Sequence, residues 1–250
     1  MLLSAVIITY NEEKNIARCI ESLNAVADEI IVVDSFSSDR TKEICSNYPN
    51  TKFFEQKWLG YSQQKNYANS LASYDYILSI DADEAVSEEL KQSINNIDFH
   101  PNVFYSVNRL TNYCGKWIRH CGWYPDSRIR IFHKSVKWSG DFVHETLLLP
   151  DNAEINRLEG NLLHYSFYST SEHIKRIDKY STLSAKECFV KGKKINLLGL
   201  LIKPSWKFIR DYFFKLGFLD GFAGYQVCKI SAFATFLKYT KLREYYREKK

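Results

Sequence analysis

The chain has 250 residues, of which 45% are hydrophobic and 25% charged, with a formal net charge of +5. A chain of this size can bury a large core, and its 10 Gly and 5 Pro exclude collagen-like and broadly disordered proteins. Because no run of about 18 apolar residues occurs, no membrane-spanning helix is expected. The N-terminus lacks a basic segment and a cleavage site, so we expect no secretory signal. The six scattered cysteines, with no CxxC pair, then indicate reduced thiols in a cytoplasmic protein.

The first hundred residues alternate between strand and helix patterns. The first strand, residues 4–10, is a continuous apolar run, which is typical of a parallel strand buried on both faces. Further strands are predicted at 29–34, 51–56 and 74–81, and helices at 11–23 with Asn11 as its cap, within 35–48, at 60–73, and at 87–97 capped by Ser87. This alternation predicts an α/β fold with a doubly wound, mostly parallel sheet.

Residues 101–165 change character, with strands predicted around 104–111, 128–133 and 154–166 that extend the same sheet. From about residue 170 the chain is predicted to be helical. We therefore predict a first domain over 1–168 and a C-terminal helical extension over 169–250.

Polar and acidic side chains follow three of the first four predicted strands. These are Thr9, Tyr10, Asn11 and Glu12 after the first strand, Asp34 and then Asp39 after the second, and Asp81, Asp83 and Glu84 after the fourth. Ligands of such sheets bind at the carboxyl ends of the strands. The D-x-D pair at 81–83 suits Mg²⁺ or Mn²⁺ held together with a diphosphate, although such a pair is equally often a solvated or capping loop. No glycine-rich phosphate loop of either common type is present.

Three segments in this order resemble the inverting family 2 glycosyltransferases, which have the GT-A fold. They read VIITYNEE, IVVDSFSSDRT and ILSIDADE, and they cover about the first 90 residues. The later GWYPDSRIRIF and GDFVHE, with KLGFLDGFAGY in the tail, are similar to a narrower branch, the bacterial lipopolysaccharide-core β-glucosyltransferases. The resemblance then extends over nearly the whole chain and implies a nucleotide-sugar donor.

The resemblance also implies roles for residues at the first two strand ends. Thr9, Tyr10 and Glu12 would contact the nucleoside, and Asn11 would shape the turn. Asp34 would accept a hydrogen bond from the base, with uracil N3–H as the expected donor. A base that lacks this donor would leave the carboxylate unpaired and would be discriminated against.

A further set of roles implied by the resemblance concerns the diphosphate and the metal. Lys65 would lie near the nucleotide, Asp81 near the ribose and the divalent metal, and Asp83 would ligate that metal. Asp39 is open to two interpretations, because it lies where the family often has an acid and could equally cap the following helix.

The catalytic base is the least determined part of the prediction. The family often has a Glu-Asp pair downstream of D-x-D, and this chain has none in that region. We rank Glu145 first, because it follows a strand-like segment and has His144 beside it, then Asp126, with Asp141 as a third candidate. Asp126 could instead be a turn residue, and His164 could approach the metal or be structural.

Other residues of the middle region have both functional and structural interpretations. Arg128 and Arg130 alternate in a predicted strand and so share one face, where they would reach the diphosphate or acceptor, or simply solvent. Trp117, Trp123 and Tyr124 could stack on sugar rings or pack in the core.

The last quarter of the chain is strongly basic. Residues 186–250 carry 15 Lys and Arg against 5 Asp and Glu, interleaved with aromatic residues, whereas residues 1–185 carry 19 against 24. This pattern fits a peripheral contact with an anionic membrane surface or a plain helical cap with a basic outer face. The resemblance, which implies a lipid-linked acceptor, favours the membrane surface. Nucleic acid is not expected as a partner, because no recognisable reading motif is present.

The residues and the resemblance together predict an inverting, metal-dependent glycosyltransferase. It would move a hexose, most simply glucose from UDP-glucose, onto a lipid-linked oligosaccharide such as a lipopolysaccharide core, at the inner face of the cytoplasmic membrane. The alternatives are transfer to a polyprenyl phosphate or a protein glycan, and a non-catalytic nucleotide-sugar-binding module. A nucleotidyltransferase would need a glycine-rich loop near the N-terminus, where this chain has ITYNEEKN.

Overall fold

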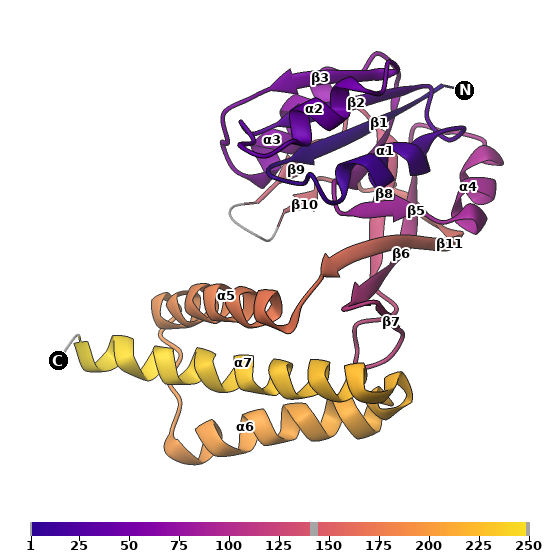
Figure 1. The fold of residues 1–250 in the computed structure, drawn as a ribbon. Coiled ribbons are helices and arrows are strands. Elements are labelled where there is room, and N and C mark those ends of the chain that lie inside the picture. The colour runs from indigo at the N-terminus through magenta and orange to yellow at the C-terminus, as the bar shows by residue number, and fades with distance from the viewer. Residues whose placement is uncertain (1, 141–144, 249–250) are drawn as a thin grey trace. The chain divides into compact units, whose positions relative to one another are not determined.

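The computed structural model describes residues 2–140 and 145–248. The chain forms two compact units, one built from 1–109 with 126–165 and the other from 110–125 with 166–250. The first unit holds most of the sheet and helices α1 to α4, and the second holds helices α5 to α7 (Figure 1). The boundary near 165 lies close to the expected one at 168, and residues 110–125 group with the C-terminal helices.

Four parallel strands form one half of the main sheet, in the order β3-β2-β1-β4. They are β1 (Leu3–Thr9), β2 (Glu29–Asp34), β3 (Thr51–Glu55) and β4 (Tyr76–Asp81). All of β2 and nearly all of β1 and β4 are buried, which explains their continuous apolar runs. The four predicted strands are confirmed.

The other half of the sheet is antiparallel and continues from β4 through β8, β6 and β11 to β5. These strands are β5 (Glu84–Val86), β6 (Val103–Tyr113), β8 (Ser127–His133) and β11 (Glu154–Phe167), with β7 (Lys116–Ile118) paired to the end of β6. A separate hairpin joins β9 (Trp138–Ser139) to β10 (Thr146–Leu147). The predicted α/β class, with a parallel sheet that later strands extend, is confirmed.

Helices cover both faces of the parallel strands. They are α1 (Ile16–Leu23), α2 (Thr41–Ser46), α3 (Tyr61–Ser70) and α4 (Glu88–Asn95). Alternate residues of β1 enter two different cores: Ala5 and Ile7 pack with α1 and α4, while Val6 packs with Ala68 of α3. A strand presents successive side chains to opposite faces, so an apolar residue at every position requires both faces to be covered.

The start of α1 differs from the prediction. The helix begins at Ile16, and Asn11 adopts a left-handed conformation with φ of 54° instead of capping it. Its side-chain Oδ1 accepts a hydrogen bond from the Ser38 backbone N–H at 2.8 Å, so a contact with a distant loop replaces the local cap. Ser87 does cap α4 as predicted, since its hydroxyl accepts from the Leu90 N–H.

The second unit consists of the β6–β7 turn region and a set of helices. These are α5 (Thr170–Val190), α6 (Leu197–Ile209), the π-helical turn η1 (Arg210–Phe214), the 3₁₀ turn η2 (Gly217–Asp220) and α7 (Gly221–Glu248). Within this unit α7 packs against both α5 and α6 (Figure 1). Across the described residues, every helix is too short or too polar to cross a bilayer.

Candidate active site

Three strand ends meet at the carboxyl edge of the parallel strands. Thr9, the last residue of β1, lies opposite Asp34 of β2, and the preceding Ile8 lies opposite Asp81 of β4. Parallel strands in register end at the same edge, so the sheet itself brings these residues together. The predicted clustering of polar strand ends is therefore observed for Thr9, Asp34 and Asp81.

Asp34 is buried, with 1% exposure, and organises the loop that follows β2. Its carboxylate accepts from the Ser37 backbone N–H at 2.7 Å and from the Ser37 hydroxyl. The Ser37 hydroxyl oxygen in turn accepts from the Asn11 N–H at 2.7 Å. Asp34 thus joins the loops after β1 and β2, and an ionised carboxylate still has acceptor capacity beyond these two bonds.

Asp39 and Thr41 fasten the same two loops at a second point. The Asp39 carboxylate accepts from the Glu13 N–H at 3.0 Å and from both the N–H and the hydroxyl of Thr41. The Thr41 hydroxyl oxygen accepts from the Glu12 N–H at 2.9 Å. Burial opposes the ionisation of Asp39, but the hydrogen bonds from Thr41 and Glu13 prevail and lower its pKa. Of the two interpretations of Asp39, these contacts favour the structural one at the start of α2.

Lys65 of α3 connects two acids that are far apart in the chain. Its ammonium lies 3.1 Å from Glu145 Oε1 and 3.5 Å from Asp81 Oδ1, and 4.6 Å from the Trp138 ring centre. The Lys65 side chain is 5% exposed, whereas those of Asp81 and Glu145 are 31% and 20% exposed. A buried ammonium is stable only with such partners, and both acids keep an accessible side. The structure therefore places Glu145 next to the end of β4.

Arg130 of β8 holds the other side of Asp81. One guanidinium nitrogen lies 2.8 Å from Asp81 Oδ2 and 2.6 Å from Glu84 Oε1. Burial opposes the ionisation of Asp81, but Arg130 and then Lys65 hold its pKa well below its usual range. Glu84 is fully buried, and burial, aided by the nearby Asp81 charge, raises its pKa. Asp81 is thus an ionised carboxylate held between two cations.

Sequence reasoning missed the roles of Glu84 and Arg130. The sequence groups Glu84 only with the strand-end acids, and it predicts for both Arg128 and Arg130 a contact with the diphosphate or the acceptor, or else exposure to solvent. The structure confirms that Arg128 is exposed, at 54%, whereas the Arg130 side chain is 4% exposed. The sequence does hold a signal for this pair: Glu84 directly precedes the apolar residues Ala85 and Val86 in a short strand, which indicates that it is buried with them. A buried carboxylate requires a nearby cation.

Asp83 lies beside His164 of β11. His164 Nε2 is 3.1 Å from Asp83 Oδ2, and the Asp83 carbonyl accepts from the Tyr165 N–H at 2.8 Å. The antiparallel pairing of β11 with β5, in which His164 lies opposite Glu84, produces this contact. Within residues 2–140 and 145–248, no three His, Cys, Asp or Glu side chains form a ready metal cluster.

Asp126 occupies a different environment from Glu145. Arg109 donates to its Oδ2 from two nitrogens, at 2.9 and 2.7 Å, and Arg128 donates to its Oδ1 at 2.8 Å. Both carboxylate oxygens therefore face arginines. The third base candidate, Asp141, and the predicted neighbour of Glu145, His144, lie outside the described residues.

The aromatic candidates of residues 110–125 belong to the second unit. Trp123 packs with Tyr113, Phe167 and His173 in the core of that unit, with ring centroids 5.7–6.1 Å apart. For Trp123 these contacts favour the core-packing interpretation over sugar stacking.

Comparison with known proteins gives consistent matches over the chain. A profile described as Glycosyl transferase family 2 matches residues 4–149. An uncharacterized glycosyltransferase of Rickettsia typhi is 33% identical over 254 residues, covering 97% of this chain and 87% of that protein. The lipopolysaccharide core biosynthesis glycosyltransferase LpsC of Rhizobium meliloti is 29% identical over 255 residues, covering 96% and 91%. The structure of S. aureus TarS 1-349 in complex with UDP aligns with a TM-score of 0.49 and 18% identity, covering 100% of this chain and 92% of that chain.

Proposed function

The chain belongs to glycosyl transferase family 2 and is a glycosyltransferase, and from that premise we propose that it is an inverting hexosyltransferase that uses UDP-glucose. The observation that carries the proposal is the group formed by Lys65, Asp81 and Glu145 at the carboxyl edge of the sheet. It combines a cation that can face a diphosphate with a carboxylate that can take a proton.

The donor would bind over the ends of β1, β2 and β4. Thr9, Tyr10 and Glu12 would contact the nucleoside, in a loop whose shape Asn11 and Asp34 maintain. Asp34 would use its remaining acceptor capacity for an N–H of the base. Tyr10 is 58% exposed in this structure, so its ring is accessible to a ligand.

Glu145 is our candidate for the base that deprotonates the acceptor hydroxyl. The hydroxyl oxygen would attack the anomeric carbon, its proton would pass to Glu145, and the bond to the nucleoside diphosphate would break on the opposite face. A bound diphosphate would give Lys65 a third anionic partner, after Asp81 and Glu145, and would thereby weaken the ion pair between Lys65 and Glu145. Asp126 is the weaker candidate, because Arg109 and Arg128 already engage both of its oxygens.

The residues around Asp83 fit a divalent cation, Mg²⁺ or Mn²⁺. Carboxylate oxygens suit these ions and an imidazole nitrogen can accompany them, and Asp83 Oδ2 lies 3.1 Å from His164 Nε2. Asp83 and His164 would hold the ion; within the described residues no third His, Cys, Asp or Glu side chain groups with them, so Asp81 would join only after its side chain moves away from Lys65. Such an ion would stabilise the charge that develops on the leaving diphosphate.

The acceptor in this proposal is a lipid-linked oligosaccharide, such as a lipopolysaccharide core. The similarity to LpsC along nearly the whole chain supports this class of acceptor. The protein would then work at the inner face of the cytoplasmic membrane, with its basic second unit in peripheral contact with anionic lipid.

The proposal is tested by paired variants of the two base candidates. Glu145→Gln should lower kcat by about 10²–10⁴-fold and leave UDP affinity within a few-fold, because only proton transfer is lost. Asp126→Asn should lower kcat much less. Equal losses in both variants would contradict the assignment of Glu145. Wild-type protein that binds UDP-glucose but neither hydrolyses nor transfers it would instead indicate a non-catalytic module.

A further inference from the structure

One side of α6 carries large apolar side chains that are more than half exposed. Leu197, Leu198, Leu201, Ile202 and Trp206 are 53–63% exposed. Their spacing of three to four residues places them on one side of the helix. Such side chains normally lie inside a protein, so a helix that exposes them in a row has an apolar face that the described residues of the second unit leave uncovered.

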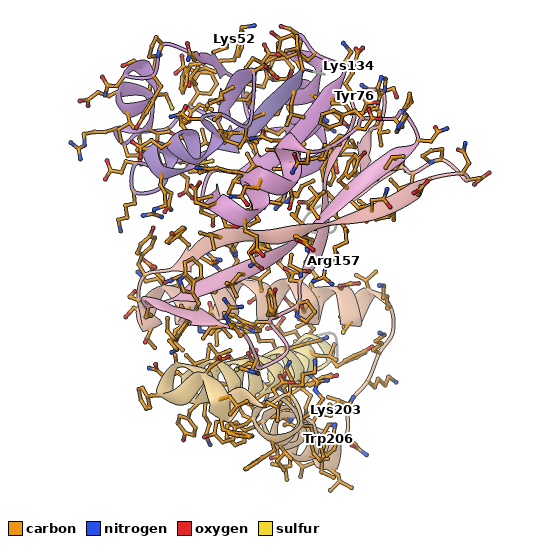
Figure 2. The ribbon with its side chains drawn as sticks, turned by 90° about the vertical axis from the view of Figure 1, so that its right-hand side faces the viewer. Lys52, Tyr76, Lys134, Arg157, Lys203 and Trp206 are labelled. Atoms are coloured by element: carbon orange, nitrogen blue, oxygen red, sulfur yellow. The ribbon has the colours of Figure 1, made fainter. Side chains whose placement is uncertain are left out.

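Two other residues of α6 account for its packing within the unit. Leu200 is buried, and the Phe208 ring, in the last turn of the helix, packs against a core that contains Val227 and Cys228 of α7. These contacts hold the helix and leave the side chains named above exposed. Figure 2 shows Lys203 and Trp206 at the outer edge of the second unit.

The exposed apolar surface continues past the end of α6. Phe213 and Phe214 in η1, Leu219 in η2 and Phe222 at the start of α7 are 55–74% exposed. Trp206 and Phe214 have ring centroids 5.8 Å apart, which joins the surface of α6 to that of η1. We call the set the apolar face; its members are Leu197, Leu198, Leu201, Ile202, Trp206, Phe213, Phe214, Leu219 and Phe222.

The charges around the apolar face are of one sign. Residues 188–243 contain eleven Lys and Arg but only two acids, Asp211 and Asp220. Both acids are buried: Asp211 pairs with Lys207 and Arg210, and Asp220 accepts from backbone N–H groups of the β7 turn. The surface of this segment therefore exposes cations and no carboxylate.

Exposed lysines lie at both ends of the apolar face. Lys193 and Lys194 precede α6, Lys203 lies within it, and Lys215 separates η1 from η2. Apolar side chains bordered by cations match the interfacial zone of an anionic bilayer, where the chains enter the acyl region and the ammonium groups meet lipid phosphates. A protein partner would more often be matched by mixed charges at the rim.

We propose that the apolar face inserts into the surface of an anionic bilayer, with α6 lying in the plane of the interface. The 13 residues of α6 span about 20 Å at 1.5 Å per residue, less than the ~30 Å hydrocarbon core, so the helix lies in the interface and does not cross it. The proposal names the part of the second unit that contacts lipid, and it rests on the proposed function, in which the acceptor is lipid-linked. The rest of α7, where Leu242 packs against Ala185 of α5, stays outside the bilayer.

The test is flotation of the full-length protein with vesicles of phosphatidylethanolamine and phosphatidylglycerol, compared with phosphatidylcholine alone. The wild type should bind the anionic vesicles, and brominated lipid should quench a fluorescence signal that disappears in Trp206→Phe. Leu201→Glu and Phe214→Glu should each weaken binding at least about tenfold. Replacing Lys193 and Lys194 by Gln should weaken it about fivefold per lysine, and added salt should reduce that difference.

The matched control is Ile155→Glu, which places the same charge at an apolar residue of the first unit that is 51% exposed. It should bind vesicles within about twofold of the wild type, since it lies outside the apolar face. Asp83→Ala should also bind normally, so a failure of the catalytic proposal is distinguishable from a failure of this one. Wild-type binding by Leu201→Glu would overturn the proposal. So would a lipid-free dimer, seen by light scattering, that Leu201→Glu dissociates, because a second copy would then cover the face.

Discussion

Replacing Lys65 by methionine tests whether this side chain neutralises the acids of the candidate site. The change keeps most of the apolar stem and removes the ammonium from between Glu145 at 3.1 Å and Asp81 at 3.5 Å. Removing one partner of a buried ion pair destabilises proteins by about 3–5 kcal/mol. Here Asp81 keeps Arg130 at 2.8 Å, and both acids are partly exposed. The free energy of unfolding of Lys65→Met should therefore fall by ~3 kcal/mol, the lower limit of that range.

The assay is urea unfolding at neutral pH. With a slope of ~3 kcal/mol per M for a protein of this size, the midpoint of Lys65→Met should fall by about 1 M. Lys42→Met is the matched control, since Lys42 pairs with Glu55 at 2.8 Å but both side chains are more than a third exposed. An exposed pair contributes at most ~1 kcal/mol, so its midpoint should move by about 0.3 M or less. Equal shifts in the two variants would refute the reasoning, as would an unchanged midpoint in Lys65→Met.

Three further predictions concern the stability of the fold. Burial, aided by Arg176, lowers the pKa of His173 to about 4. The free energy of unfolding should therefore be highest above pH 6.5, the pKa of an unfolded histidine, and should fall by up to ~3 kcal/mol as the pH drops to about 4. His173→Phe should flatten this acid limb in urea titrations, and an unchanged limb would contradict it. Hydrogen bonds from Lys52 and two serines overcome the effect of burial and lower the pKa of Glu29 to about 2. Glu29→Gln should therefore lower the free energy of unfolding by ~3 kcal/mol above pH 4.5 and by almost nothing near pH 2. Gly160→Ala should lower the melting temperature strongly, because a Cβ at this position would lie 2.3 Å from the α4 backbone. Gly192→Ala is the control, since a Cβ there meets open space and adds only the strain of a positive φ. Similar shifts in the two variants would refute the steric explanation.

The architecture of the first unit is predictable from sequence because its strongest signals are local. The apolar runs of β1, β2 and β4 reflect strands covered on both faces, and all three occur where predicted. The meeting of Thr9, Asp34 and Asp81 at one edge follows from parallel register alone. Local periodicity and topology rules suffice for these features.

The features that sequence reasoning missed depend on contacts between distant residues. Asn11 has the residue type and position of a helix cap, but a bond to Ser38, 27 residues away, holds it in a turn. The pairing of Glu84 with Arg130 spans 46 residues across the antiparallel half of the sheet. The local pattern can indicate that Glu84 is buried, but it does not identify Arg130 or Ser38 as a partner, because each contact depends on the final packing of the loops and strands.

The preference for Glu145 over Asp126 shows the same limit. Sequence spacing ranks both acids as candidate bases without showing their partners. The structure distinguishes them, since Glu145 faces one lysine shared with Asp81 whereas Asp126 faces two arginines. The difference arises from the strand order β4-β8-β6, which places Arg109 and Arg128 on neighbouring strands.

The most direct test of the central claim is calorimetric titration of UDP, ADP and GDP into the wild type and Asp83→Ala, with and without Mn²⁺. The account predicts that UDP binds the wild type more tightly than ADP or GDP and that Mn²⁺ strengthens UDP binding. The Mn²⁺ effect should be lost in Asp83→Ala, while its thermal unfolding stays close to that of the wild type. Absence of nucleotide binding under every condition, or an undiminished Mn²⁺ effect in Asp83→Ala, would contradict the proposed donor site.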